Sequence, residues 1–251
     1  MIKYFSILLL ILVTTNIANA KPDLVVYGSH RLDAPLKKII TAFEKENKIS
    51  IKSDFGCGAP KLIPSLKAKQ DGDVLILGED TELKLAKKAG LVDSSSTVAW
   101  NPFVIVVKKG NPIKVKSPAD LKKARLNLPQ QGSGCASRLS DSIVSMWGLS
   151  EAASKAERLD RGCKSTLGSE MVARGESDAT FTWRIVAAPV RGIEMIPIEK
   201  TRGAPCECYG IVLNGAKNPE LAKKFVDYLK GPKAQAIFRE AGMLDLQEKA
   251  K

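Results

Sequence analysis

Short apolar runs alternate with segments of helical periodicity in the first third of this chain. In one such segment, Leu36, Ile39, Ile40 and Phe43 recur at intervals that place them on one face of a helix. We expect strands at residues 24–27, 49–52 and 73–77, and helices at 34–46, 60–69 and 81–88. This alternation of strand and helix predicts a parallel sheet that is covered by helices.

The same two patterns continue to the end of the chain. The run at residues 103–107 is uninterrupted and apolar, as expected for a buried strand. Further strands are expected at 179–183, 195–198 and 209–213, and helices at 137–146, 166–175, 219–230 and 232–241. No internal repeat is evident, so the pattern predicts an α/β protein built from different segments.

The first 20 residues have the features of a signal peptide. Lys3 supplies a positive start, residues 5–13 are apolar, and Ala18-Asn19-Ala20 matches a cleavage site. An uncleaved anchor is the less favoured alternative, because the apolar run is too short to cross a bilayer. We therefore expect a periplasmic protein that begins near Lys21 and is long enough for two lobes of about 100 residues each.

The net charge of the chain is +12, from 39 basic and 27 acidic residues. The lysines are scattered in pairs such as Lys37-Lys38 and Lys223-Lys224, which is typical of solvated helix faces. Nucleic acid is not an expected partner of an exported chain with few aromatic residues and no basic run. The positive field favours small anions as solutes.

Three cysteines stand in turns that contain glycine or serine and that precede predicted helices. They are Cys57 before Gly58, Cys135 after Gly134, and Cys163 before Lys164. The start of a helix offers unpaired backbone N–H groups and the positive end of the helix dipole, which together attract anions. The same position lowers the pKa of a thiol. If these turns converge, they form a site for a small anion or a soft ion.

The remaining cysteines leave several interpretations open. Cys206 and Cys208 flank one residue and therefore point to the same face of a strand. The cysteines can be small buried residues, or Cys163 can form a disulfide with Cys206 or Cys208. A third reading gathers Cys57, Cys135, Cys163, Cys206 and Cys208 around Cu(I), Zn²⁺ or a trivalent metalloid. No cofactor is expected in the principal reading.

Several segments carry a resemblance to a known family. They are Val25-Val26-Tyr27-Gly28, residues 73–77, the stretch 101–112 from Asn101-Pro102 to Asn111-Pro112, and the tail 218–238. The chain resembles the periplasmic solute-binding proteins of ABC transporters. Within them it is similar to the molybdate/tungstate-binding family and the related accessory colonization factor family.

The resemblance implies a two-lobed periplasmic-binding-protein fold of type II. Each lobe would be a mostly parallel sheet flanked by helices, and two crossing strands would join the lobes. We expect residues 1–20 as signal peptide, 21–105 with 208–251 as the first lobe, and 106–207 as the second lobe. Lobe closure around a ligand would accompany binding.

The resemblance also implies where the ligand lies. The family holds a tetrahedral oxyanion with backbone N–H groups and hydroxyls at turns that open helices. Carried over by position, the ligand-binding residues are His30, Arg31, Cys57, Gly58, Gly134, Cys135, Ser165, Trp183 and Arg184. Most of these side chains differ from those of the family, and Arg31 and Arg184 add charges suited to carboxylate, phosphate or sulfonate groups.

The function implied is capture rather than catalysis, and no catalytic residues are expected. The protein would bind a small anion in the cleft between the lobes and deliver it to an ABC permease in the inner membrane. The anion is either molybdate-like or a small phosphorylated or carboxylated solute. The alternatives are a thiol-based binder of a soft metal or metalloid, and an adhesin or antigen that kept the binding fold. The oligomeric state is left open.

Overall fold

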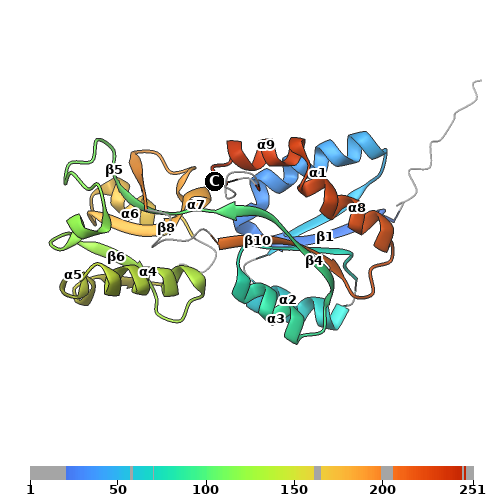
Figure 1. Cartoon of the computed structure of the whole chain (residues 1–251), viewed down its shortest axis with the longest axis horizontal. Coiled ribbons are helices and arrows are strands. Elements are labelled where there is room, and N and C mark those ends of the chain that lie inside the picture. The colour runs from blue at the N-terminus through green and yellow to red at the C-terminus, as the bar shows by residue number, and fades with distance from the viewer. Residues whose placement is uncertain are drawn as a thin grey trace, which may run out of the picture.

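The computed structural model describes residues 21–56, 59–69, 71–160, 165–198, 206–244 and 246, with the backbone alone for 59–61. Figure 1 shows two lobes side by side along the long axis of the molecule. Within these residues the strands form two five-stranded sheets, one in each lobe. The predicted two-lobed α/β fold is therefore confirmed.

The sheet of the first lobe has the strand order β2-β1-β3-β10-β4. The strands are β1 (Leu24–Ser29), β2 (Ile51–Gly56), β3 (Val74–Leu77), β4 (Val92–Asn101) and β10 (Cys206–Leu213). The helices are η1 (His30–Leu32), α1 (Asp33–Asn47), α2 (Ala59–Lys69), α3 (Asp80–Lys88), α8 (Pro219–Leu229) and α9 (Pro232–Glu240). In Figure 1, α1, α8 and α9 lie on one side of the sheet, and α2 and α3 lie on the other.

Burial on both faces explains the uninterrupted apolar strands. In β3, Val74 and Ile76 pack in the core beneath α1 and α8, whereas Leu75 and Leu77 pack in the cluster beneath α2 and α3. Alternate side chains of a strand point to opposite faces, so a sheet covered on both sides needs apolar residues at every position.

The second lobe repeats this plan with the strand order β7-β6-β8-β5-β9. The strands are β5 (Phe103–Lys108), β6 (Leu126–Pro129), β7 (Glu157–Leu159), β8 (Ala179–Trp183) and β9 (Ile193–Pro197). The helices are η2 (Pro118–Leu121), α4 (Cys135–Met146), α5 (Ser150–Ser154), α6 (Leu167–Arg174) and α7 (Arg184–Ala187).

Each sheet is mixed, with two parallel and two antiparallel strand pairs. In the first sheet β1 pairs in parallel with β2 and β3, while β10 is antiparallel to β3 and β4. In the second, β6 is parallel to β7 and β8, while β5 is antiparallel to β8 and β9. The expectation of mostly parallel sheets therefore needs correction. The antiparallel pairs are those that β10 forms in the first sheet and β5 forms in the second.

The first crossing between the lobes occurs at Pro102. β4 ends at Asn101 in the first sheet, and β5 begins at Phe103 in the second. The backbone N–H of Arg184 donates to the Pro102 carbonyl at 2.8 Å. On the first-lobe side, Trp100 and Leu244 exchange two backbone hydrogen bonds of 2.9 Å each.

The strand pairing also shows where the chain changes sheet. β5 pairs with the second sheet from Phe103 onward, and Cys206 of β10 already pairs with Asn101 of the first sheet. The expected lobe boundaries at 105/106 and 207/208 stay predictions. The expected signal peptide, residues 1–20, lies outside the described residues.

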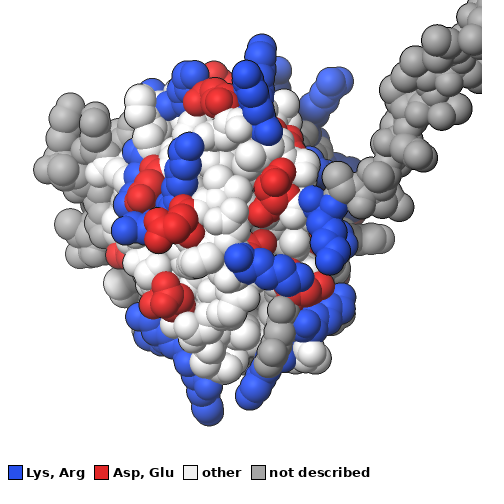
Figure 2. Space-filling model, turned by 90° about the vertical axis from the view of Figure 1, so that its right-hand side faces the viewer, with Lys and Arg blue, Asp and Glu red and all other residues white. Residues whose placement is uncertain are grey.

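The surface charge is dispersed at the end of the first lobe. Figure 2 shows blue Lys and Arg side chains interspersed with red Asp and Glu side chains around a largely uncharged centre. In the described part of the chain, no helix combines the length and apolar character that a membrane span requires.

We predict that Asp73→Ala destabilises the first lobe. The buried Asp73 carboxylate accepts backbone N–H groups from Val25 at 2.8 Å and from Lys217 at 2.7 Å. Removing it leaves these donors without their acceptor, at an expected cost of about 2–4 kcal/mol in the free energy of unfolding. Urea denaturation measures this cost. Asp93→Ala, at an exposed position of β4, is the control and is expected to change it by less than about 0.5 kcal/mol.

Candidate functional site

Glu79 connects the two lobes through a single carboxylate. It follows β3 of the first lobe and is 5% exposed. One oxygen, Oε1, accepts a hydrogen bond from the Arg31 guanidinium at 2.8 Å. The other, Oε2, accepts the backbone N–H of Cys135 at 2.8 Å, in the first turn of α4 in the second lobe. The helix N-terminus therefore already binds an anionic group, as the dipole and the free N–H favour.

Arg31 is held between two buried carboxylates. Its guanidinium forms ion pairs with Glu79 at 2.8 Å and with Glu82 at 3.2 Å. Burial alone would lower the pKa of Arg31, but the two glutamates raise it above its ordinary value. Arg31 was predicted to bind an anionic solute. In the structure Glu79 and Glu82 already pair with its guanidinium, so a solute would compete with them for this charge.

Gly134 shapes the turn before α4. Its φ of 105° lies in the region that L-residues with side chains rarely adopt. A Cβ at this position would lie 3.8 Å from Glu79 Oε1, which is an ordinary van der Waals distance. The backbone conformation, and not the space for the carboxylate, therefore favours glycine here.

Two thiols meet beside this carboxylate. Sγ of Cys135 lies 2.9 Å from Sγ of Cys206, the first residue of β10. The hydrogen bond from Cys206 and the nearby Arg138 guanidinium lower the pKa of Cys135, although burial opposes this. The same hydrogen bond and burial raise the pKa of Cys206. The two pKa values move in opposite directions because one shared hydrogen bond favours the charged form of Cys135 and the neutral form of Cys206.

Asp80 completes a cluster with these cysteines. A carboxylate oxygen of Asp80 and the sulfurs of Cys135 and Cys206 all lie within 4.8 Å of one another. Arg138 faces the same group, with its guanidinium 3.6 Å from an Asp80 oxygen. We call Glu79, Asp80, Arg138, Cys135 and Cys206 the junction cluster.

Cys208 does not join the junction cluster. Its side chain is fully buried, and its thiol lies 3.9 Å from the Gly78 carbonyl oxygen. Burial raises its pKa to about 12, so it is a neutral thiol near pH 7. This placement fits a small core residue. Cys57, Gly58 and Cys163 lie outside the described residues.

His30 and Ser165 form a second contact between the lobes. Ser165 Oγ lies 3.5 Å from His30 Nε2. Burial, with a smaller contribution from the Arg31 charge, lowers the pKa of His30 below its ordinary value. The imidazole is therefore neutral near pH 7. The structure thus brings His30, Arg31, Gly134, Cys135 and Ser165 to the boundary between the lobes.

Trp183 and Arg184 have different environments, although they are neighbours in sequence. The Trp183 ring is 2% exposed and packs edge-on against Phe103, with the ring centroids 4.7 Å apart. It therefore belongs to the core and offers packing surface. Arg184 is exposed, and its side chain passes beside Gly242 near the end of the chain.

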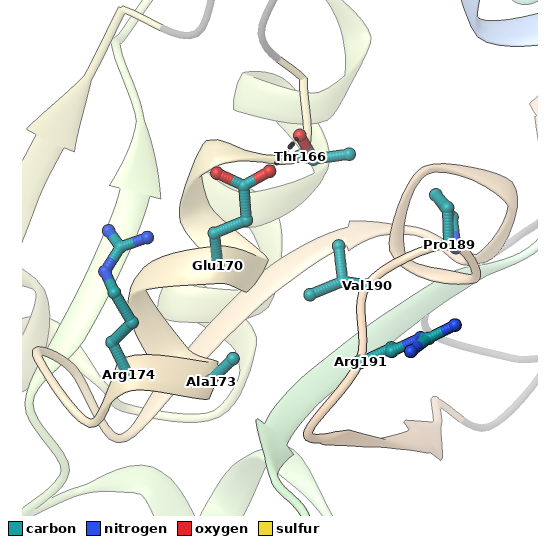
Figure 3. Close-up of a pocket in the computed structure, with 7 residues that line it drawn as sticks. All are labelled: Thr166, Glu170, Ala173, Arg174, Pro189, Val190 and Arg191. Atoms are coloured by element: carbon teal, nitrogen blue, oxygen red, sulfur yellow. Dashed lines mark hydrogen bonds between the residues drawn. The ribbon is translucent and has the colours of Figure 1, made fainter.

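A pocket of about 390 Å³ lies within the second lobe and not at the boundary between the lobes. Its lining residues are Thr166, Glu170, Ala173, Arg174, Pro189, Val190 and Arg191. Figure 3 shows Arg174 and Arg191 on opposite sides of it, with Glu170 hydrogen-bonded to Thr166. None of the predicted site residues lines this pocket.

The sequence reasoning missed Glu79, Asp80 and Arg138. A signal for the first two was available, because Gly78-Glu79-Asp80 directly follows the buried run at 73–77. The loops after parallel strands are the usual position of ligand sites in α/β proteins.

We predict that Arg31→Met destabilises the protein by about 3 kcal/mol. The substitution leaves Glu79 and Glu82 largely buried without their positive partner. Chemical denaturation gives the loss, and Lys37→Met at an exposed ion pair is the control. The triple variant with Glu79→Gln and Glu82→Gln should recover much of the loss, and a triple variant no better than Arg31→Met would contradict this origin.

Two known proteins resemble this chain in sequence over most of its length. A binding protein from Haemophilus influenzae is 25% identical over 257 residues, covering 96% of this chain and 98% of the relative. The molybdate-binding protein ModA of Mycobacterium tuberculosis is 26% identical over 230 residues, covering 88% of this chain and 84% of ModA.

A solved structure shares the fold. The substrate binding domain of a molybdenum ABC transporter from Clostridium difficile aligns with a TM-score of 0.75 at 18% identity. The alignment covers 89% of this chain and 98% of that domain. These relatives are binding proteins. The resemblance to solute-binding proteins of ABC transporters, with molybdate-binding relatives, is confirmed.

The family model for bacterial extracellular solute-binding proteins matches residues 24–244, which include both sheets and the junction cluster. This chain therefore belongs to the bacterial extracellular solute-binding protein family.

Proposed function

We propose that this protein is the periplasmic solute-binding component of an ABC-type importer and that it captures a small anion between its lobes. The family and the fold support capture of a solute. The signal-peptide pattern of residues 1–20 supports export to the periplasm. The anion is the finer part of the proposal and rests on the boundary between the lobes.

The contact between Glu79 and the backbone N–H of Cys135 is the observation that carries the proposal. It is a carboxylate from one lobe bound to the first turn of a 12-residue helix in the other. An N–H group that binds a carboxylate oxygen at 2.8 Å can bind an oxygen of another anion in the same way. Glu79 thus occupies the position that we assign to an oxygen of the solute.

Capture is then an exchange of one anion for another. The incoming anion takes the N–H of Cys135, while Glu79 keeps its pairing with Arg31. The exposed Arg184 and Arg138, with its 56% exposed side chain, supply positive charge, and His30 and Ser165 supply polar contacts. Closing the lobes around the anion excludes water and strengthens each contact. The permease would recognise this closed state.

The relatives and the charges support the proposed class of anion. ModA is named for binding molybdate, and the Clostridium difficile domain belongs to a molybdenum transporter. A tetrahedral oxyanion suits a helix N-terminus, and a phosphorylated or carboxylated solute suits the added arginines. We therefore place the solute among small oxyanions and phosphorylated or carboxylated acids.

We predict that at least one small anion raises the Tm of the purified protein. The panel is molybdate, tungstate, sulfate, phosphate and a phosphorylated three-carbon acid, with chloride as the control. A bound anion at about 100 times its Kd should raise Tm by about 5 °C or more. Failure of every panel member, together with a native mass spectrum that shows no anionic cargo, would sink the proposal.

We also predict that Glu79→Gln strengthens anion binding by about tenfold. The neutral side chain competes less well than a carboxylate for the Cys135 N–H, and it removes a repulsive charge. Isothermal titration calorimetry with the anion selected from the panel measures Kd. Glu82→Gln is the matched control, because Glu82 pairs with Arg31, whereas Glu79 is the carboxylate that accepts the Cys135 N–H. Equal effects of both variants would contradict the exchange.

A further inference from the structure

Sulfur and carboxylate ligands converge at the junction cluster. Sγ of Cys135, Sγ of Cys206 and an oxygen of Asp80 lie within 4.8 Å of one another. They come from three separate elements, namely the start of α4, the start of β10 and the start of α3. Two thiols and one carboxylate from distant parts of the chain form a donor set of the kind that binds a metal ion.

The distance between the sulfurs of Cys135 and Cys206 lies between that of a disulfide and that of two thiolates bound to one metal ion. At 2.9 Å the atoms are farther apart than the ~2.05 Å of a disulfide. They are closer than the roughly 3.8 Å that two sulfurs take around one tetrahedral Zn²⁺ with Zn–S bonds of ~2.3 Å. A change of under about 1 Å in this separation, within the reach of side-chain rotation, would admit the ion.

The combination of two sulfur ligands and one oxygen ligand favours some metal ions over others. Cu(I) prefers sulfur alone, whereas Mg²⁺ and Ca²⁺ prefer oxygen alone. Zn²⁺ accepts both thiolate and carboxylate ligands. The carboxylate of Asp80 beside the two sulfurs therefore favours Zn²⁺ over Cu(I).

The surrounding charges balance for a divalent ion. Two thiolates and the Asp80 carboxylate carry three negative charges, which Zn²⁺ and the adjacent Arg138 together neutralise. Glu79, the other carboxylate of the cluster, shares the positive charge of Arg31 with Glu82 and is not counted among the three. A divalent cation at this position thus leaves no added net charge at the partly buried junction.

We propose that Cys135, Cys206 and Asp80 form a Zn²⁺ site that joins the two lobes. The ion would be bound by two thiolates and one carboxylate, with the fourth position open to water or to a small ligand. Binding releases the two thiol protons to solvent. Because Cys135 belongs to the second lobe, whereas Cys206 and Asp80 belong to the first, the bound ion would hold the lobes together.

This site goes beyond the proposed capture of an anion, and its atoms are different. The anion uses the backbone N–H of residue 135, whereas Zn²⁺ uses the sulfur of the same residue. Cys206 supplies a sulfur to Zn²⁺ and no group to the proposed anion site. Cys206→Ser is therefore expected to preserve anion binding and to lower Zn²⁺ affinity by at least a hundredfold, so failure of one proposal is distinguishable from failure of the other.

The test is titration of the reduced full chain with Co²⁺ and Zn²⁺. Co²⁺ should give a thiolate-to-cobalt charge-transfer absorption in the near ultraviolet, and Zn²⁺ should bleach it by displacement. Zn²⁺ at about 100 times its Kd should raise Tm by about 5 °C or more. It should also protect two cysteines from alkylation, which peptide mass spectrometry identifies as Cys135 and Cys206.

Matched variants assign the ligands. Cys135→Ser and Cys206→Ser should each lower Zn²⁺ affinity by at least a hundredfold, and Asp80→Asn should lower it by about tenfold. Cys208→Ala and Asp93→Asn are the controls, because Cys208 is buried in the core and Asp93 is exposed on β4.

Two results would overturn the proposal. One is reduced protein that shows no thiolate-to-cobalt band and no Zn²⁺-dependent rise in Tm. The other is a freshly isolated protein in which Cys135 and Cys206 form a disulfide and no metal is present. The second result would make the pair a covalent link between the lobes.

Discussion

The contact between the lobes depends on the buried Glu79 carboxylate, which has one partner in each lobe. A buried carboxylate needs both charge compensation and hydrogen bonds. Arg31 supplies the charge from the same lobe, and the Cys135 N–H supplies a donor from the other lobe. Separating the lobes would break the hydrogen bond between Glu79 and the Cys135 N–H. Water or a bound solute would then have to supply a new partner for each group.

Strand direction explains why these particular residues meet. β1 and β3 are parallel neighbours, so the segments that follow them, which carry Arg31 and Glu79, emerge at the same edge of the first sheet. β6 and β8 are likewise parallel, which brings the turn before Cys135 to one edge of the second sheet. Parallel strands thus gather polar loops at one edge, and the crossing strands bring the two edges together.

Much of the scaffold could be predicted from sequence. The helical spacing of Leu36 and Phe43 and the apolar run at 73–77 identified α1 and β3, because both pack into the core. β4 was missed, since its first half, Asp93-Ser94-Ser95-Ser96, is polar and reads as a loop. Its strand conformation depends on pairing with β10, a contact distant in sequence.

The candidate site was predictable only in part. Cys135 was identified from its turn, because a helix start has a local signature in Gly134 and the helical pattern that follows. The partners of Cys135 were not predictable, since Glu79 and Cys206 reach it through strand pairing and lobe contact. Trp183 was assigned by position in a related family, whereas its environment is set by Phe103.

The two backbone hydrogen bonds between Trp100 and Leu244 affect how the lobes can move. These two residues tie the end of the chain to β4 immediately before Pro102, and Phe103 enters the other sheet immediately after it. On this connection only Pro102 lies between the two strands, and its carbonyl accepts the Arg184 N–H. A rotation of one lobe against the other would therefore change the backbone dihedral angles next to Pro102, because the residues on both sides of it are held in strands.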